Sequence, residues 1–178
     1  HATRTGYYIY KFIDPNLDLL QNRTSVHHWV IMRYAEILLS YAEAMNEAYG
    51  PTGNVGYRLN AVRALNQVRN RVGVEMPAVP TAISKEELRE KIRNERRVEL
   101  AFEDHRFWDV RRWMIAEQEG VMSGAMYGIK IYWINSSPQE FRYTPYLYEN
   151  RTFTKKMYLH PFSTNEVNKG YLIQNPGY

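Results

Sequence analysis

The stretch ERRVELAFEDHRFWDVRRW, residues 95–113, has the strongest pattern in this chain, because charges and aromatic rings are interleaved along it. Ten of its nineteen residues are charged, and four are Phe or Trp. On a helix, side chains three and four positions apart are neighbours. Four acid–arginine pairs are therefore expected: Arg96–Glu99, Glu103–Arg106, Arg106–Asp109 and Asp109–Arg112. A fully solvated helix does not need large rings within such a network. The stretch predicts a partly buried set of ion pairs that fixes one helix against its neighbours.

A catalytic interpretation of the same stretch would use Glu99, Glu103 and Asp109 as acid and base. Each of these carboxylates has an arginine within helical reach, and a nearby positive charge lowers the pKa of a carboxyl group. A carboxyl group with a low pKa is a poor general acid at neutral pH. The pattern therefore favours a structural role over a catalytic one.

Two further helices are predicted before this stretch. The first spans about 30–49, with an apolar stripe that ends at Gly50-Pro51. The second spans about 57–72, followed by Gly73 as a C-terminal cap. Together they form an antiparallel helical hairpin, the unit of TPR-like arrays, without an internal repeat. The residues of the first stripe are Ile31, Ala35, Leu38, Ala42, Met45 and Tyr49, widened by Tyr34, Ile37 and Tyr41, and those of the second are Ala61, Val62, Leu65, Val68 and Val72.

A third helix is predicted to begin at Ser84, because Ser84 and Glu87 have the spacing of a capping box. Its apolar spacing extends to Phe102, and near Asp104-His105 the helix is expected either to continue or to kink into a segment that carries Phe107 and Trp113. The fold predicted from these helices is mainly α.

The C-terminal part has a different composition, with twelve aromatic residues among residues 127–178 and no long helical period. Residues 129–133 and 143–148 are predicted as short strands or ordered loop, and 165–169 as one helical turn. Residues 5–12 alternate like a short strand. We therefore expect one domain or fragment over 1–178, with a helical core at about 26–120 and a loop-rich, aromatic segment at about 121–178.

Composition excludes several classes of protein. The chain has 178 residues, 44% hydrophobic and 24% charged, which is typical of a folded domain. It has no cysteine, so it has neither disulfides nor a cysteine-based metal site. No apolar run approaches the roughly 20 residues that a membrane-spanning helix needs. The net charge is +4, but 23 basic and 19 acidic residues are interleaved, so no nucleic-acid partner is expected.

The candidate binding residues are the aromatic and planar polar side chains of the C-terminal part. An exposed aromatic ring beside planar hydrogen-bonding groups can bind a ligand that combines an apolar face with a polar rim. The first candidate group comprises Tyr132, Trp133, Asn135, Arg142 and Tyr143, with Gln139 nearby. The second candidate is Trp29, which is preceded by His27 and His28.

No metal or cofactor site is predicted. His27 and His28 are adjacent and therefore point in different directions, and no HExxH spacing occurs. The chain has neither a glycine-rich phosphate loop nor a G-x-S-x-G elbow. A remaining catalytic alternative is that Glu140 and Glu149 act as the carboxylate pair of a glycosidase.

Three blocks of the sequence resemble the C-terminal region of the SusD/RagB family. They are RYAEILLSYAEA (33–44) with ALNQVRNRVG (64–73), the stretch 84–113 with its ER..ELAFE..R..D.RRW pattern, and YLHPFSTNEVNKGYLIQNPGY (158–178). Their order and spacing agree with the family. The segment LHPFS (159–163) departs from it, because the family usually has a sequence closer to Pro-Ile-Pro there.

The resemblance implies a non-catalytic, SusD-like protein that binds oligosaccharide or polysaccharide at the cell surface. It further implies a partner, a TonB-dependent, SusC-like transporter of the outer membrane, over which the protein closes as a lid. Members of the family are longer and carry a lipid anchor on an N-terminal cysteine, so this chain is expected to be the C-terminal part of such a protein. The alternative is a helical protein–protein interaction module that docks onto the transporter and has no ligand site of its own.

Overall fold

The computed structural model describes residues 3–26 and 28–178, which divide into two compact units. The helical unit spans 25–107, and the hairpin unit comprises 3–24 and 108–178. The two units divide between Phe107 and Trp108. The boundary predicted near residue 120 instead marks a change in amino-acid composition. No helix among the described residues is long and apolar enough to cross a bilayer.

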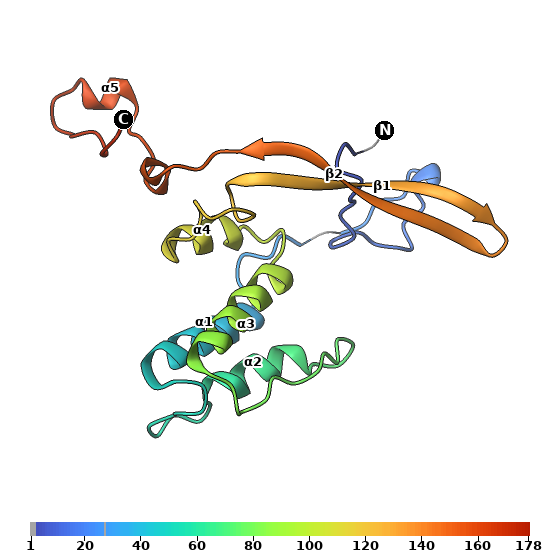
Figure 1. The fold of residues 1–178 in the computed structure, drawn as a ribbon, viewed down its shortest axis with the longest axis horizontal. Helices are drawn as coiled ribbons and strands as arrows, with labels where there is room; N and C mark the ends of the chain where they lie inside the picture. The colour runs from blue at the N-terminus through green and yellow to red at the C-terminus, as the bar shows by residue number, and fades with distance from the viewer. Residues whose placement is uncertain (1–2, 27) are drawn as a thin grey trace. The chain divides into compact units, whose positions relative to one another are not determined.

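The helical unit contains α1 (Tyr34–Tyr49), α2 (Ala61–Arg69) and α3 (Lys85–Glu99), and α1 packs against both of the others (Figure 1). The predicted helical hairpin and the mainly α fold are thus confirmed. The apolar faces of these helices meet in one core. Its largest members are Leu38, Leu39 and Met45 from α1, Val62, Leu65 and Val68 from α2, Leu88 and Ile92 from α3, and Val79 and Leu100 from the connecting chain.

Helix α1 differs from its prediction at both ends of the stripe. It begins at Tyr34 instead of Val30, because Arg33 has an extended backbone at the N-cap position and Ile31 before it is exposed. Tyr49 is exposed as well, while Leu39 is fully buried although it lay outside the predicted stripe. The buried face of α1 is therefore rotated toward Leu39.

Helix α2 is shorter than predicted at both ends, because it begins only after Asn60 and ends at Arg69, with Asn70 and not Gly73 at the C-cap position. The side chain of Asn60 accepts a hydrogen bond from the backbone N–H of Arg63, 2.9 Å away, and so caps the helix. Helix α3 begins as predicted. The Ser84 hydroxyl accepts from the N–H of Glu87, and the Glu87 carboxylate accepts from the N–H of Ser84.

The helix neither continues nor kinks after α3, as the sequence had suggested, but breaks completely. Helix α3 ends at Glu99, Phe102 and Asp104 both have positive φ, and α4 (His105–Arg112) then begins. A positive φ cannot be part of a right-handed helix, so these residues end one helix and allow the next to begin in a new direction. The chain passes from the helical unit to the hairpin unit within α4.

The hairpin unit contains the long antiparallel hairpin of β1 (Gly124–Ser136) and β2 (Gln139–Arg151) (Figure 1). Both strands include the predicted short strands and are longer, so residues expected to be ordered loop belong to this sheet. Val110, Ala116 and Phe153 form a small buried core beside it. Short helical turns complete the unit: η1 (Leu19–Gln21), η2 (Lys155–Tyr158) and α5 (Thr164–Val167), the last close to the turn predicted at 165–169.

The N-terminal segment crosses β1 without forming the predicted strand. The N–H of Ile129 donates to the Thr5 carbonyl at 2.8 Å, and the Tyr146 hydroxyl donates to the Arg4 carbonyl. The crossing requires glycine at two positions. A Cβ at Gly6 would lie 1.9 Å from the Ile129 oxygen, and a Cβ at Gly128 would lie 2.9 Å from the Thr5 oxygen.

The C-terminal residues QNPGY are hydrogen-bonded to the segment that contains His160 and Phe162. The Gln174 amide accepts from the N–H of Phe162 and donates to its carbonyl, both at 2.9 Å. The Asn175 side chain donates to the His160 carbonyl, and the Lys156 ammonium lies 4.7 Å from the centre of the Tyr178 ring. The QNPGY ending therefore has a structural role in the hairpin unit.

Candidate functional site

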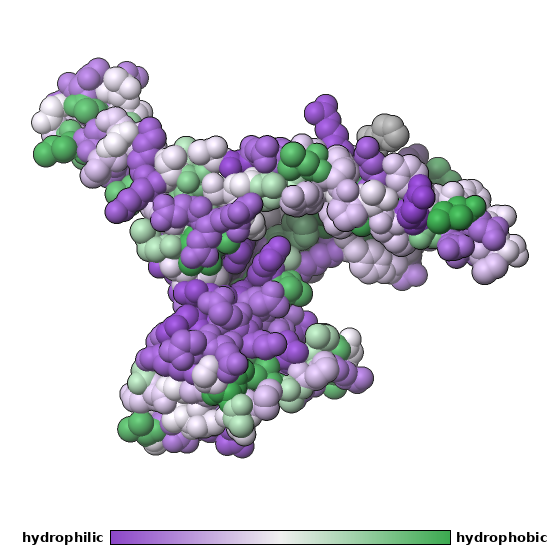
Figure 2. Space-filling model, viewed as in Figure 1, coloured by the Kyte–Doolittle hydropathy of each residue, from purple (hydrophilic) through white to green (hydrophobic). Residues whose placement is uncertain are grey.

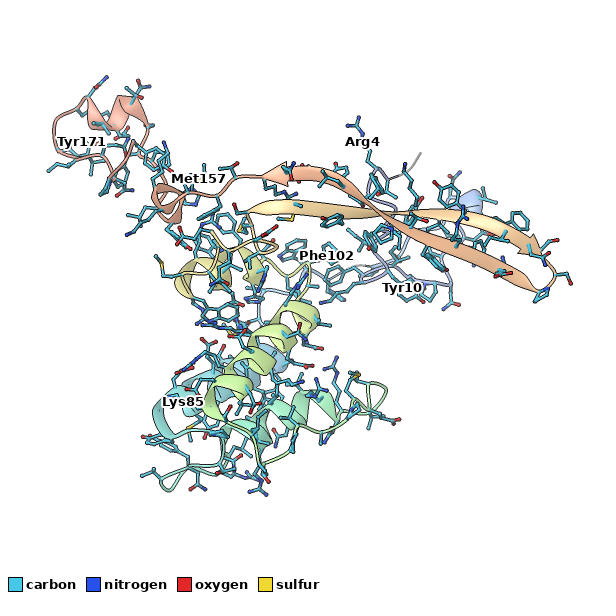
Figure 3. The ribbon with its side chains drawn as sticks, in the orientation of Figure 1. Arg4, Tyr10, Lys85, Phe102, Met157 and Tyr171 are labelled. Atoms are coloured by element: carbon cyan, nitrogen blue, oxygen red, sulfur yellow. The ribbon has the colours of Figure 1, made fainter. Side chains whose placement is uncertain are left out.

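The β-hairpin carries the candidate binding residues, and its register divides them between two faces. Successive side chains of a strand point to opposite faces, and residues paired across an antiparallel ladder share a face. We call one face the stacking face, formed by Ile131, Trp133, Phe141, Tyr143, Pro145 and Leu147. We call the other the cationic face, formed by Lys130, Tyr132, Arg142, Thr144 and Tyr146. Figure 3 shows side chains projecting from both strands along the hairpin.

The stacking face is an exposed row of aromatic and aliphatic side chains. Trp133 is opposite Phe141, and Ile131 is opposite Tyr143. Trp133 is 67% exposed and Tyr143 is 59% exposed. The indole N–H of Trp133 donates to the carbonyl of Asn135, which limits the rotation of the ring. In the view of Figure 2, hydrophobic residues are visible on the hairpin near its turn. Fixed, exposed rings of this kind can stack against the apolar face of a sugar.

The cationic face has its rings covered by charged side chains. The guanidinium of Arg142 lies 5.1 Å from the centre of the Tyr132 ring, and the Lys130 ammonium lies 5.1 Å from the centre of the Tyr146 ring. Both distances fit cation–π contacts. A ring face that holds a cation is less available to a sugar. The adjoining pocket, about 570 Å³, is lined by Thr3, Arg4, Gly6, Tyr8, Tyr146 and residues 129–132.

The residues predicted as one aromatic platform are thus close in the hairpin but divided between its faces. Trp133 and Tyr143 lie on the stacking face, and Tyr132 and Arg142 lie on the cationic face. A β-bulge separates Trp133 from Asn135, so Asn135 pairs with Glu140. Because adjacent residues of a strand point to opposite faces, the predicted strand at 129–133 was already enough to place Tyr132 and Trp133 on different faces.

Trp29, the second aromatic candidate, belongs to the helical unit. It is exposed, and so are Ile31 and Met32 in the segment before α1. Its neighbour His27 lies outside the described residues. Among the residues that the structure describes, no group of three or more His, Asp or Glu side chains could hold a metal ion.

Glu140 and Glu149 do not have the geometry of a glycosidase pair. They are nine residues apart on the one strand β2, so about 30 Å of extended chain separates them at roughly 3.3 Å per residue. Glycosidase carboxylates are about 5–10 Å apart. This pair therefore cannot flank a single glycosidic bond.

Glu99 and Glu103 hold Arg33, and this contact joins the chain before α1 to the end of α3. Arg33 Nε lies 2.7 Å from one Glu103 oxygen, and its Nη1 lies 2.6 Å from Glu99 Oε1. Its Nη2 also donates to the Glu99 carbonyl at 2.6 Å. Burial alone would lower the pKa of Arg33, but the hydrogen bonds to Glu103 and Glu99 outweigh that effect and raise it.

The stretch 95–113 therefore does form a partly buried ion-pair network, but part of it runs between segments distant in the sequence. Arg71 contacts Glu99 at 2.8 Å, and Arg69 contacts Glu95 at 2.5 Å. The predicted pair Asp109–Arg112 is confirmed at 3.0 Å. The role of Arg33 was missed because no sequence spacing links it to residues almost seventy positions away.

Comparison with known proteins gives one consistent result. The model of the SusD family matches residues 1–178. SusD-like protein P2 of Formosa agariphila is 35% identical over 111 residues, which are 60% of this chain and 20% of that protein. A solved SusD-like protein from Bacteroides fragilis is 37% identical, with a TM-score of 0.67 over 85% of this chain and 26% of that one.

A SusD-like carbohydrate binding protein from Bacteroides vulgatus is 24% identical, with a TM-score of 0.52 over 78% of this chain and 28% of that one. This likeness supports the fold alone. The chain spans about a fifth of the length of the curated relative and about a quarter of each solved structure.

Proposed function

We propose that this chain, which belongs to the SusD family, binds an oligosaccharide or polysaccharide at the cell surface without catalysing a reaction. The stacking face of the hairpin is the proposed contact. In the whole protein, a lipid anchor would hold it at the outer membrane, and a TonB-dependent, SusC-like transporter would receive the glycan. The family resemblance supports these wider roles.

The observation that carries the proposal is the exposure of the rings on one side of the hairpin. Large aromatic side chains usually lie in a core or at an interface, yet Trp133 and Tyr143 face solvent on the same strand face. A sugar exchanges hydrogen bonds with water for hydrogen bonds with protein, with a small net gain. We therefore expect weak affinity at one such site, with stacking as its main component.

The alternative is a helical interaction module that docks onto the transporter. It has its own observation: Trp29, Ile31, Met32, Tyr34 and Ile37 are exposed before and along α1. A run of exposed apolar residues is typical of a protein-contact surface. In that case glycans would not bind, and the rings of the hairpin would contact protein.

Affinity electrophoresis of the 178-residue chain in gels that contain neutral plant, host or microbial polysaccharides tests the proposal. We expect retardation by at least one glycan, and its loss in Trp133→Ala. Thr144→Ala is the matched control, because Thr144 lies on the opposite face of the same hairpin. High salt should leave the retardation unchanged, since stacking is not screened as charge contacts are.

Two results would sink the proposal: absence of retardation in every gel, or equal retardation of the wild type and Trp133→Ala. Loss in Trp29→Ala instead would place the contact in the helical unit. Release of reducing sugar from a retarding glycan would contradict the non-catalytic role.

A further inference from the structure

The segment 48–74 of the helical unit has an unusual charge composition. It contains four arginines and no Asp or Glu. Arg69 and Arg71 contact the carboxylates of Glu95 and Glu99. Arg58 and Arg63 are exposed and have no ion-pair partner among the described residues. The outer side of α2 therefore carries positive charge that the rest of the unit does not neutralise.

These two arginines line a groove on the surface of the helical unit. The groove consists of two pockets, of about 680 and 430 Å³, that share Arg58, Leu59 and Gln67. Arg63, Gln67 and Asn70 follow at intervals of four and three residues, so they share one helical face. No carboxylate lines either pocket among the described residues. We call it the Arg–Tyr groove, formed by Arg58, Leu59, Arg63, Asn66, Gln67, Asn70, Tyr34, Tyr41 and Tyr57.

Tyrosine rings form one side of the Arg–Tyr groove. Tyr34 is 70% exposed and Tyr57 is 53% exposed. The Tyr41 hydroxyl donates to the Leu59 carbonyl at 2.8 Å, which fixes the chain that carries Tyr57 and Arg58 against α1. Exposed rings thus lie in the same groove as guanidinium and amide groups.

We infer that the Arg–Tyr groove binds an anionic sugar residue, one that bears a carboxylate or a sulfate ester. A guanidinium can donate two parallel hydrogen bonds to either group, and it remains charged at any physiological pH. The tyrosine rings can stack on the sugar, and Gln67 and Asn70 can bond its hydroxyls. This inference and the proposed function both concern a glycan ligand, but they concern different sites. The Arg–Tyr groove belongs to the helical unit, and the stacking face belongs to the hairpin unit.

An acidic peptide fits this lining less well. Apart from Leu59 and the tyrosine rings, the groove has no apolar side chain that could receive the side chains of a peptide. A peptide in a groove gains much of its affinity from such anchors. The planar polar groups around the rings instead match the hydroxyl rim of a sugar.

The test uses matched pairs of polysaccharides in affinity gels at low salt. Dextran sulfate is compared with dextran, and polygalacturonate with its methyl ester, so that only the charged group changes. We expect retardation by at least one charged member and none by its neutral partner. The member that retards identifies the anion as sulfate or carboxylate.

Two double variants separate a site from general attraction. R58Q/R63Q removes both groove arginines, and K91Q/R97Q removes two exposed positive charges from α3, so both lower the net charge equally. We expect R58Q/R63Q to weaken binding at least about tenfold, because two charge-assisted contacts are lost, and K91Q/R97Q to change it less than about twofold. Trp133→Ala should leave this binding unchanged.

Three outcomes would overturn the inference. Equal weakening in both double variants would indicate unspecific charge attraction. Retardation by poly-glutamate with the same dependence on Arg58 and Arg63 would indicate an acidic peptide ligand. If neither charged polysaccharide retarded the chain, the Arg–Tyr groove would not be an anion site. Binding of a neutral glycan through Trp133 could still be correct in that case.

Discussion

The same contact occurs once in each unit, in two different surroundings. In the helical unit, the Asn66 amide donates to the Val79 carbonyl at 2.9 Å and accepts from its N–H at 2.8 Å. In the hairpin unit, the Gln174 amide makes the same two bonds with Phe162. Val79 is only 6% exposed, whereas Phe162 is 41% exposed. Identical geometry should therefore contribute differently to stability, because water can replace the second contact but not the first.

The contrast extends to the charged and aromatic residues of the units. The helical unit buries Glu95, Arg96 and Glu103, while the hairpin exposes Trp133 and Tyr143. Buried charges and exposed rings both depart from the usual distribution of these side chains. The buried charges are held by hydrogen bonds and fix the scaffold. The faces of the exposed rings are available to a ligand.

The largest effect is expected from Glu103→Ala, which removes a nearly buried carboxylate that accepts two hydrogen bonds from Arg33. Loss of one partner of such a pair costs about 3–5 kcal/mol. Urea unfolding followed by far-ultraviolet circular dichroism measures the change. Glu90→Ala, at a largely exposed pair with Arg93, is the control, with a change within about 0.5 kcal/mol. Equal effects of both variants would show that burial does not set the contribution.

A smaller loss is expected from Asn66→Ala. The substitution leaves the N–H and the carbonyl of Val79 without their partners in a place that water reaches poorly. We expect a loss of about 2–3 kcal/mol in the free energy of unfolding. Hydrogen exchange at the Val79 amide gives a local measurement, and its protection should fall. Unchanged protection would mean that the loop is held by its packing alone.

The matching substitution in the hairpin unit, Gln174→Ala, should have a smaller effect. Water can bond the exposed backbone groups of Phe162, so we expect a loss of about 1 kcal/mol or less. The change should appear as faster exchange of the Phe162 amide, without a shift in the unfolding of the helices. A loss equal to that of Asn66→Ala would contradict the comparison on which both predictions rest.

The smallest effect concerns the surface pair of Glu47 and Arg89. The hydrogen bond from Arg89 lowers the pKa of Glu47 below its ordinary value of 4.5, and burial opposes this shift only in part. The contribution of the pair is therefore complete above pH 4.5 and is lost as the pH falls through the lower pKa of the folded state. Glu47 is 42% exposed, so solvent screening limits the effect to about 0.2–1 kcal/mol.

Urea unfolding of the wild type and Glu47→Gln across acid pH measures this contribution. The difference between the two proteins should shrink as the pH decreases. A difference that grows toward low pH would have the wrong sign for a carboxylate with a lowered pKa.

Local patterns predicted much of the fold because they depend on neighbours in the chain. The capping box at Ser84 and the pair Asp109–Arg112 both arise within a few residues. The start of α1 was predicted four residues too early, because Arg33 is kept extended while its side chain bonds Glu99 and Glu103. Such a distant constraint leaves no local signal.

The candidate site was predictable in its residues but not in its arrangement. Aromatic density marked the region of Tyr132 and Trp133, and strand alternation separates the two, but only the hairpin register adds Phe141 to the face of Trp133 and Arg142 to the face of Tyr132. The Arg–Tyr groove was missed, because Tyr34 and Arg58 belong to separate helical patterns and meet only when α1 packs against α2.

The helical hairpin, the resemblance to the SusD/RagB family and the absence of cysteine chemistry follow from the sequence alone, because periodicity, motif order and composition are properties of the chain. The buried charges, the rings that face solvent and the arginines of the Arg–Tyr groove are instead set by the tertiary fold. Those outcomes depend on contacts between residues far apart in the chain, where packing, not spacing, selects the partner.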